Sequence, residues 1–310
     1  MITRADIDKA AQRTAGLVRR TPVLQADAGT AAGPVWFKCE FMQHTGTFKA
    51  RGALNRILAS KERGELQADV GVVVASGGNA GLANAYAAAQ LGVPATVFVP
   101  EAAPAVKVGK LRAIGATVVQ GGSEYAAAYQ AAIAHAEKTG AIYCHAYDQP
   151  EIAAGAGTVG SELLEQVPDV DTVLVAVGGG GLMAGVAAAV EGLAKVVAVE
   201  PETAPTLHAA LAAGEPVDVP VSGVAADSLG ARSVGDIGFS VAVRCGVGSV
   251  LVSDEHIIAA RSALWNDYRI VVEHGAAAAY AALASGAYVP GKDERVAVIL
   301  CGANTDPATL

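Results

Sequence analysis

The chain has 310 residues, 52% of them hydrophobic, which is enough for one large α/β unit or for two lobes that share a cleft. Its 22 basic and 30 acidic side chains leave a formal net charge of −8, with no basic run and few aromatic residues to stack on bases, so we expect no nucleic-acid partner. The N-terminal segment MITRADIDKAAQRTAG has acidic residues early and no apolar core. It predicts neither a secretory signal nor a transit peptide, and we expect a cytoplasmic protein.

Four cysteines are scattered without the CxxC spacing of a metal site, at positions 39, 144, 245 and 301. In a cytoplasmic protein this favours reduced thiols over disulfides. The uncharged stretch 172–190 has the length of a membrane span, but four consecutive glycines lie in its centre. Those glycines favour a turn between a buried strand and a helix, so we expect no membrane-spanning segment.

The first segment that could carry out chemistry is residues 44–53, HTGTFKARGA. Thr47 is a credible N-cap for a helix that holds Lys49 in its first turn. Unpaired N–H groups and the positive end of the helix dipole disfavour a protonated amine there. The pKa of Lys49 should therefore fall, which would make a free amine available for Schiff-base chemistry. Taken alone, this local pattern is found more often around a solvated surface lysine than around a lysine with a chemical role.

Short β-branched runs then alternate with alanine-rich helical stretches, which is typical of parallel sheets covered by helices. The predicted strands are 72–74, 95–99, 117–119 and 141–143, followed by a second set at 172–177, 196–199 and 295–300. The predicted helices between the first four strands are 82–91, 105–114 and 123–138. Two doubly wound lobes are the natural interpretation, with ligands bound beyond the carboxyl ends of their strands.

A loop between the strand at 72–74 and the next helix reads Ser76-Gly77-Gly78-Asn79-Ala80. Its glycines let backbone N–H groups approach an anion, and Asn79 adds a donor and an acceptor. The loop could therefore hold a carboxylate or a phenolic oxygen. An ordinary strand-to-helix turn with a left-handed Asn is an equally good interpretation of this segment alone.

After the strand at 172–177 comes Gly178-Gly179-Gly180-Gly181-Leu182, which has the composition of a phosphate cradle. Consecutive N–H donors lie there without any Cβ to obstruct them, in front of a helix N-terminus. The segment does not fit GxGxxG spacing, and Glu200 is the only acidic residue placed to end the next strand. A nicotinamide-dependent fold is therefore a weaker alternative.

A lysine in a helical turn, an Asn-bearing glycine loop and a phosphate-type glycine loop match a cofactor with an aldehyde, a phenol and a phosphate. On these motifs, and on Cys301-Gly302-Ala303-Asn304 near the end, the sequence resembles the serine/threonine dehydratase family of fold-type II pyridoxal-phosphate (PLP) enzymes along nearly its whole length. Cys301, where many relatives have Ser, and Ala80 are most similar to the catabolic serine dehydratase branch.

The resemblance implies an α/β fold with the cofactor between a large PLP-binding domain, residues 1–66 and 147–310, and a small mobile domain, residues 67–146. It also implies a homodimer. The implied cofactor contacts are a Schiff base at Lys49, Phe48 beside the cofactor, Asn79 on the ring's 3′-oxygen, Gly178, Gly179, Gly180, Gly181 and Leu182 at the phosphate, and Cys301 facing the pyridine nitrogen. The implied substrate contacts are Ser76, Gly77, Gly78, Asn79 and Ala80, which would bind the substrate carboxylate.

Two departures from the family narrow these expectations. Serine racemases carry a hydroxyl at the position of Gly77, so racemization should be poor here. In cation-binding relatives a glutamate, a backbone carbonyl and an acid form a site; Glu200 and the Ala204 carbonyl match it, but Thr206 replaces the acid. A divalent cation is therefore doubtful and a monovalent cation is conceivable.

We predict from the resemblance that Lys49 removes the Cα proton of L-serine or L-threonine, that water is eliminated, and that pyruvate or 2-oxobutyrate forms with ammonia. Neither a thiol nor a hydroxyl keeps the ring nitrogen protonated as a carboxylate would, which favours prompt elimination over transamination. Alternatives are a racemase, a hydroxyaspartate dehydratase, a β-replacement synthase, a nicotinamide oxidoreductase or an inactive PLP-binding or amino-acid-binding module.

Overall fold

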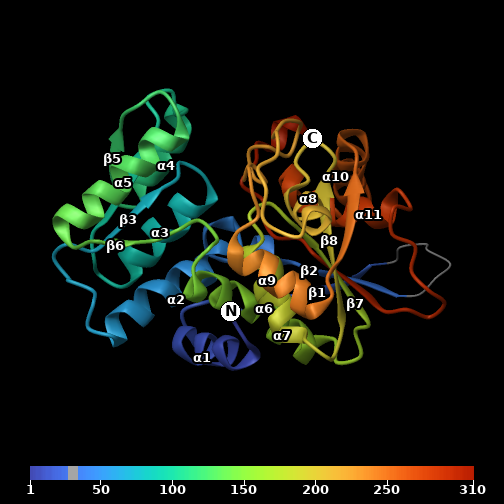
Figure 1. The fold of residues 1–310 in the computed structure, drawn as a ribbon. Coiled ribbons are helices and arrows are strands. Elements are labelled where there is room, and N and C mark those ends of the chain that lie inside the picture. Colours follow the sequence, from blue (N-terminus) through green and yellow to red (C-terminus); the bar gives the residue numbers. More distant parts are fainter. Residues whose placement is uncertain (27–33) are drawn as a thin grey trace.

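The computed structural model describes residues 1–26 and 34–310, which form two lobes, each built around one sheet (Figure 1). The larger sheet has the order β1-β2-β10-β7-β8-β9 and the smaller one β5-β4-β3-β6. All strand pairs are parallel except β1 with β2. The strands are β1 (Val23–Ala26), β2 (Val35–Lys38), β3 (Val72–Ala75), β4 (Ala95–Val99), β5 (Thr117–Gln120), β6 (Ile142–Tyr143), β7 (Thr172–Ala176), β8 (Lys195–Pro201), β9 (Gly248–Val252) and β10 (Val296–Ile299). This arrangement confirms the predicted α/β fold.

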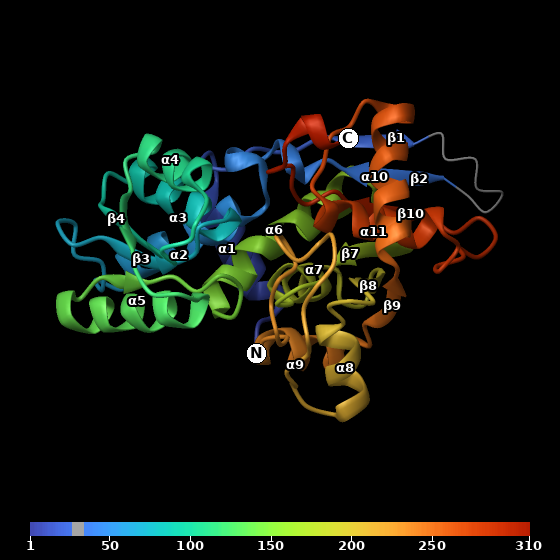
Figure 2. The ribbon, with the colours of Figure 1, turned by 90° about the horizontal axis from the view of Figure 1, so that it is seen from above.

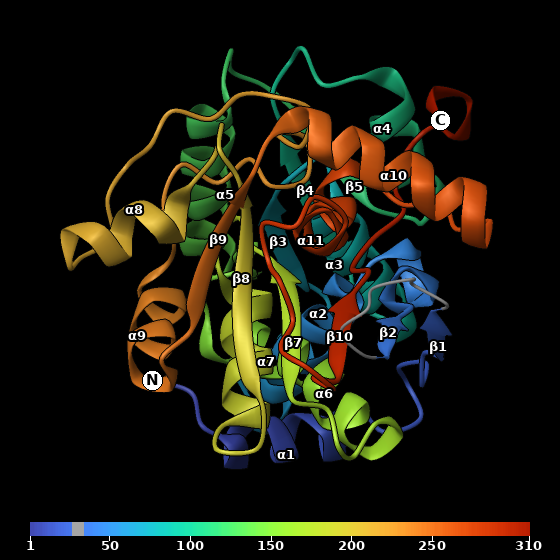
Figure 3. The ribbon, with the colours of Figure 1, turned by 90° about the vertical axis from the view of Figure 1, so that its right-hand side faces the viewer.

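Helices cover both faces of each sheet, as the alternating pattern predicts. In the larger lobe α11 packs across β7, β8 and β9 on one face, while α7 packs on β8 and on α6 and α9 on the other (Figure 3). The helices are α1 (Arg4–Thr14), α2 (Lys49–Glu62), α3 (Asn79–Gln90), α4 (Ala105–Ala113), α5 (Tyr125–Thr139), α6 (Pro150–Gln166), α7 (Gly181–Val190), α8 (Thr206–Ala213), α9 (Asp236–Cys245), α10 (Asp254–Tyr268) and α11 (His274–Ala284).

The smaller lobe contains the strands between residues 72 and 143, with α3 and α5 packed on them (Figure 2). Ala53, Leu54 and Ile57 of α2 belong to the hydrophobic core of this lobe. The same helix also packs on α6. Helix α2 therefore joins the two lobes, and its first residue is Lys49.

Small residues bring α6 and α7 together under the larger sheet. A Cβ at Gly185 would lie 2.3 Å from the Ala153 carbonyl oxygen and 2.5 Å from the Gly157 nitrogen, which no side chain permits. Because α7 can pack this closely on α6, the chain passes directly from the end of β7 into α7. The glycine turn that joins β7 to α7 faces the other lobe. Among the described residues no helix is long and apolar enough to cross a membrane.

Candidate functional site

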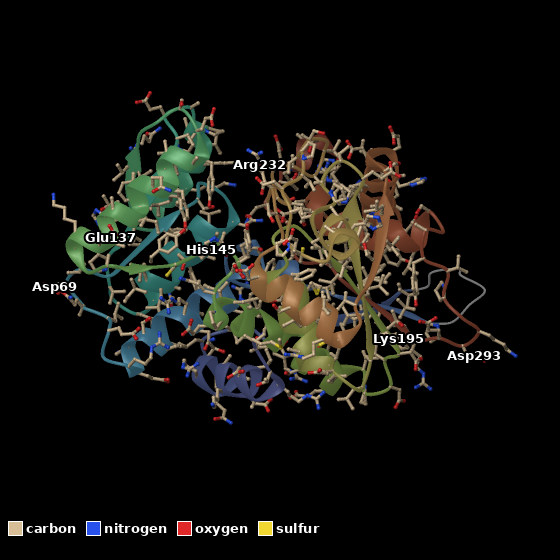
Figure 4. The ribbon with its side chains drawn as sticks, in the orientation of Figure 1. Asp69, Glu137, His145, Lys195, Arg232 and Asp293 are labelled. Atoms are coloured by element: carbon tan, nitrogen blue, oxygen red, sulfur yellow. The ribbon has the colours of Figure 1, made fainter. Side chains whose placement is uncertain are left out.

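A cavity of about 960 Å³ lies between the lobes. The structure brings the predicted cofactor and substrate residues together along its walls: Phe48, Lys49, Ser76, Gly77, Gly78, Asn79, Ala80, Gly178, Gly179, Gly180, Gly181, Leu182 and Cys301. Figure 4 labels His145, which follows β6, and Arg232, which lies between α8 and α9; both line this cavity. The two predicted cation ligands, Glu200 and Ala204, are not part of its lining.

Lys49 is the first residue of α2, which confirms its predicted place in the first helical turn. The prediction that Thr47 caps this helix is wrong, because the N-cap is Phe48 and no side chain caps it. Thr47 instead pairs with Gly302 in a β-bridge, and its buried hydroxyl has no hydrogen-bond partner among the described residues. Tertiary pairing with the segment that follows β10 therefore sets the start of α2.

The amine of Lys49 points into the cavity. Its Nζ donates a hydrogen bond to the Ala146 carbonyl at 3.2 Å and lies 4.8 Å from the centre of the Phe48 ring. Burial lowers the pKa of Lys49, while the charge of Glu273 opposes that shift. The surface-lysine interpretation is thus excluded, and the pKa falls as expected, although burial rather than the helix dipole is its largest cause.

The Asn79 loop forms the wall of the cavity on the smaller lobe. Asn79 is the first residue of α3, and the preceding turn is tightened by a hydrogen bond from the Gly78 N–H to the Ser76 hydroxyl at 3.3 Å. A Cβ at Gly81 would lie 1.9 Å from the Ser76 carbonyl oxygen, so this turn requires glycine there. The N–H groups at the start of α3 make the loop suited to an anion.

The four glycines occupy the turn from β7 into α7, on the larger lobe. Gly180 has φ of +86° and is the N-cap of α7, a conformation that favours glycine. A Cβ at Gly179 would lie 2.3 Å from the Tyr147 ring, and one at Gly181 would lie 2.7 Å from the Tyr147 carbonyl oxygen. The cradle therefore accepts no side chain, and its free N–H groups at a helix N-terminus fit a phosphate.

Cys301 lies two residues after the end of β10 and is 5% exposed. Its carbonyl accepts the Phe48 N–H at 3.1 Å, which holds it beside the start of α2. Burial raises the pKa of the Cys301 thiol to about 12. The side chain therefore remains a neutral thiol, able to face a ring nitrogen without a negative charge.

Sequence reasoning did not identify several residues of the cavity wall, and Glu273, His145 and Tyr147 are three of them. Glu273, immediately before α11, accepts the Asn79 side-chain N–H, and its burial raises the pKa of its carboxyl group. His145 and Tyr147 follow β6 on either side of the carbonyl that binds Lys49. His145 Nδ1 accepts the Tyr147 and Asp148 N–H groups at 3.2 and 2.8 Å, so its proton lies on Nε2.

Glu200 is fully buried at the end of β8, away from the cavity. Its carboxylate accepts the backbone N–H groups of Leu207 and His208 at 2.7 and 2.8 Å, and the Thr206 hydroxyl lies 3.0 Å from it. The Ala204 carbonyl accepts the Thr206 N–H at 3.1 Å. Across residues 1–26 and 34–310 no group of three His, Cys, Asp or Glu side chains could hold a metal ion. The Glu200 carboxylate and the Ala204 carbonyl therefore stabilise the start of α8, and their role as cation ligands stays a prediction.

Comparisons with known proteins agree with the geometry of the cavity. A family model described as "Pyridoxal-phosphate dependent enzyme" matches residues 14–302. The chain is 36% identical to an L-threonine ammonia-lyase of Thermotoga maritima, over 99% of this chain and 76% of that protein. It is 37% identical to a phenylserine dehydratase of Ralstonia pickettii, over 94% and 90% of the two chains.

Among solved structures, the serine racemase of Dictyostelium discoideum is similar with a TM-score of 0.91 and 33% identity, over 98% of this chain and 99% of that one. These relatives match at least 94% of this chain, and the matched residues of the family model include Lys49, Asn79, the glycines 178–181 and Cys301. The chain therefore belongs to the family of pyridoxal-phosphate dependent enzymes.

Proposed function

We propose that this protein is a PLP-dependent lyase that eliminates water from L-serine or L-threonine and releases pyruvate or 2-oxobutyrate with ammonia. The observation that carries the proposal is the Lys49 amine, which lines the cavity together with an amide-bearing loop and a glycine cradle. Among the described residues, its hydrogen-bond partner is the Ala146 backbone carbonyl. Similarity to an L-threonine ammonia-lyase over almost the whole chain supports the same reaction.

The residues of the cavity fit the cofactor group by group. Lys49 would bear it, Phe48 would lie beside it, the N–H groups of Gly178 to Gly181 with Leu182 would hold its phosphate, and Asn79 would bond its phenolic oxygen. The buried thiol of Cys301 would face its ring nitrogen. When bound, the cofactor supplies an electron sink that acidifies the Cα–H bond of an amino acid.

The protein's own groups would then bind the substrate and move protons. The Ser76 to Ala80 loop, with Gly77, Gly78 and Asn79, would hold the substrate carboxylate at the N-terminus of α3. The freed Nζ of Lys49 would take the Cα proton, because its lowered pKa favours the neutral amine that a base requires. The Ala146 carbonyl can accept a hydrogen bond from that amine and orient it.

Racemization is the main rival, since serine racemases share the fold. It requires a second proton-exchanging group on the opposite face, and Gly77 supplies none. A Cβ at Gly77 would lie 3.3 Å from Val99 Cγ1. A serine at this position would therefore also make a tight contact with the Val99 side chain of β4. Elimination without efficient racemization is therefore the better fit, and hydroxyaspartate or phenylserine are alternative substrates within the same reaction class.

Three further expectations belong to this proposal. Residues 67–146 would act as a mobile domain that closes over the substrate, and the protein would form a homodimer. A cytoplasmic location is consistent with all four cysteines being free thiols: Cys39, Cys144, Cys245 and Cys301. Sedimentation of the purified protein with and without substrate tests the assembly and the change in shape.

The reaction is tested by incubating the cofactor-loaded protein with L-serine, L-threonine, L-threo-phenylserine or L-threo-hydroxyaspartate, with no added thiol. We expect a 2-oxo acid and an equal amount of ammonia from serine or threonine, and residual substrate that remains in the L form. Accumulation of D-serine without a 2-oxo acid would instead favour a racemase. Turnover only when a thiol is present would favour β-replacement.

A further inference from the structure

Three polar side chains from distant parts of the chain meet at one wall of the cavity. Asn79 begins α3, Glu273 precedes α11, and Asn304 follows β10. Asn79 Nδ2 lies 2.9 and 3.1 Å from the two carboxylate oxygens of Glu273, and Asn304 Nδ2 lies 2.7 Å from Asn79 Oδ1. Asn79 is therefore bound at both ends of its side-chain amide.

The chemistry of the partners fixes which way this amide faces. A carboxylate only accepts hydrogen bonds, so the Asn79 nitrogen must face Glu273. Asn304 Nδ2 also donates to the Thr45 carbonyl at 2.9 Å, so its second hydrogen is the one that reaches Asn79 Oδ1. The Asn79 oxygen thus accepts from Asn304 and its nitrogen faces Glu273, which leaves the second N–H of Asn79 as the donor that it presents to the cavity.

Backbone contacts also hold Glu273 next to Gly302. The Glu273 N–H donates to the Gly302 carbonyl at 3.1 Å, and a Cβ at Gly302 would lie 2.4 Å from Glu273 Oε1. Glu273 is only 8% exposed, and the backbone N–H of Asn304 also donates to its carboxylate. Burying a carboxylate is costly unless it accepts hydrogen bonds, so the bond from Asn79 helps to hold Glu273 in this place.

We propose that Glu273 and Asn304 are positioning residues that hold the Asn79 amide with one N–H directed at the phenolic oxygen of the cofactor. The inference rests on the proposed function only in taking Asn79 as the partner of that oxygen. Neither residue needs to touch the reacting atoms, since each acts through Asn79. The arrangement favours a hydrogen-bond acceptor in the cofactor at that place.

A double-mutant cycle on cofactor binding tests this inference without relying on turnover. The dissociation constant of pyridoxal phosphate and the absorption maximum of the loaded protein are measured for wild type, Glu273→Leu, Asn79→Ala and the double variant. We expect Glu273→Leu to weaken binding about tenfold, as for loss of one strong hydrogen bond, and to shift the absorption maximum. In the Asn79→Ala background the same change should have no further effect.

Glu273→Gln is the matched control, because glutamine keeps an oxygen that can accept the Asn79 N–H at the same length. We expect it to bind the cofactor within about threefold of wild type, since the acceptor is retained. Asn304→Ala should resemble Glu273→Leu. Circular dichroism and thermal unfolding of the cofactor-free proteins identify any variant that fails to fold, and Asn304→Ala then stands in for Glu273→Leu.

The inference is overturned if Glu273→Leu and Asn79→Ala act additively, or if the folded Glu273→Leu and Asn304→Ala proteins bind the cofactor and absorb light as wild type does. It is likewise overturned if Glu273→Gln is as damaging as Glu273→Leu. A wild type that binds the cofactor in this way but releases no 2-oxo acid would contradict the proposed function and leave the role of Glu273 standing.

Discussion

The two walls of the cavity are held in very different ways. On the larger lobe, Gly178, Gly180 and Gly181 are buried, and Tyr147 packs directly on the cradle. On the smaller lobe the Ser76 to Asn79 loop is only half-buried, and a Cβ at Gly78 would meet nothing within 4 Å. The glycine cradle suited to the cofactor's phosphate is thus tightly packed, whereas the loop suited to the substrate has room at Gly78, as a site that must bind and release should.

The largest expected effect comes from adding one methyl group to the wall formed by the larger lobe. Gly179→Ala places a Cβ 2.3 Å from the Tyr147 ring and should weaken pyridoxal phosphate binding by about tenfold to a hundredfold, as overpacking costs about 1–3 kcal/mol. Gly78→Ala, the matched change on the other wall, should leave cofactor affinity within about twofold. Fluorescence titration measures both, and equal effects would contradict the proposed difference between the walls.

A smaller effect is expected from removing the buried amine. In the cofactor-free protein Lys49→Met should raise the free energy of unfolding at pH 7 by roughly 1 kcal/mol, because burial disfavours the charged amine. The folded-state pKa lies below 10.5, so the unfolded state binds the extra proton and wild-type stability rises with pH up to about that value.

The stability gain of Lys49→Met should accordingly shrink as the pH approaches 10.5. Chemical denaturation at several pH values measures it, with Lys292→Met, in the loop before β10, as a control. A gain that grows with pH would contradict the assigned direction of the Lys49 pKa shift.

The next effect concerns the contact across the mouth of the cavity. Lys107 on α4 forms an ion pair with Asp227 of the other lobe, and both side chains are exposed. Exposed ion pairs contribute about 0–1 kcal/mol, so Lys107→Met should raise KM about twofold to threefold with kcat nearly unchanged. Lys110→Met on the same helix is the control. A large fall in kcat would instead show that Lys107 takes part in the reaction itself.

The smallest effect is expected from removing metal ions. The carboxylate of Glu200 already accepts hydrogen bonds from the start of α8, so chelation with EDTA followed by gel filtration should not change the melting temperature or the cofactor affinity. Differential scanning fluorimetry with and without added magnesium, calcium or potassium measures this. A stabilisation by one of these ions that is lost in Glu200→Gln would show that the site does bind a cation.

Much of the fold was predictable because its signals are local. Buried parallel strands are short β-branched runs, and the turns that follow them need glycine, so the ends of β3 and β7 could be placed from the sequence. Helix α3 begins at Asn79, three residues before the predicted helix 82–91, because the turn at Gly77 and Gly78 leads directly into it. Element boundaries depend on such details of turn geometry.

The site was less predictable where a role depends on distant partners. Glu273 has no motif of its own, and its importance comes from lying against Asn79, 194 residues away in the chain. Thr47 looked like an N-cap, but pairing with Gly302 decides where α2 begins. In the sequence, the role of Glu273 is indicated only by its position as an acidic residue before the alanine-rich helix α11. An acidic residue at an ordinary helix start gives the same pattern.

The central claim is tested most directly at Lys49. The visible absorption spectrum and the release of 2-oxo acid from L-serine and L-threonine are measured for the cofactor-loaded wild type and for Lys49→Ala. We expect the wild type to absorb in the visible range and to turn over at least one of the two substrates, and Lys49→Ala to lose both properties. Visible absorption and turnover that both survive in Lys49→Ala would contradict the account.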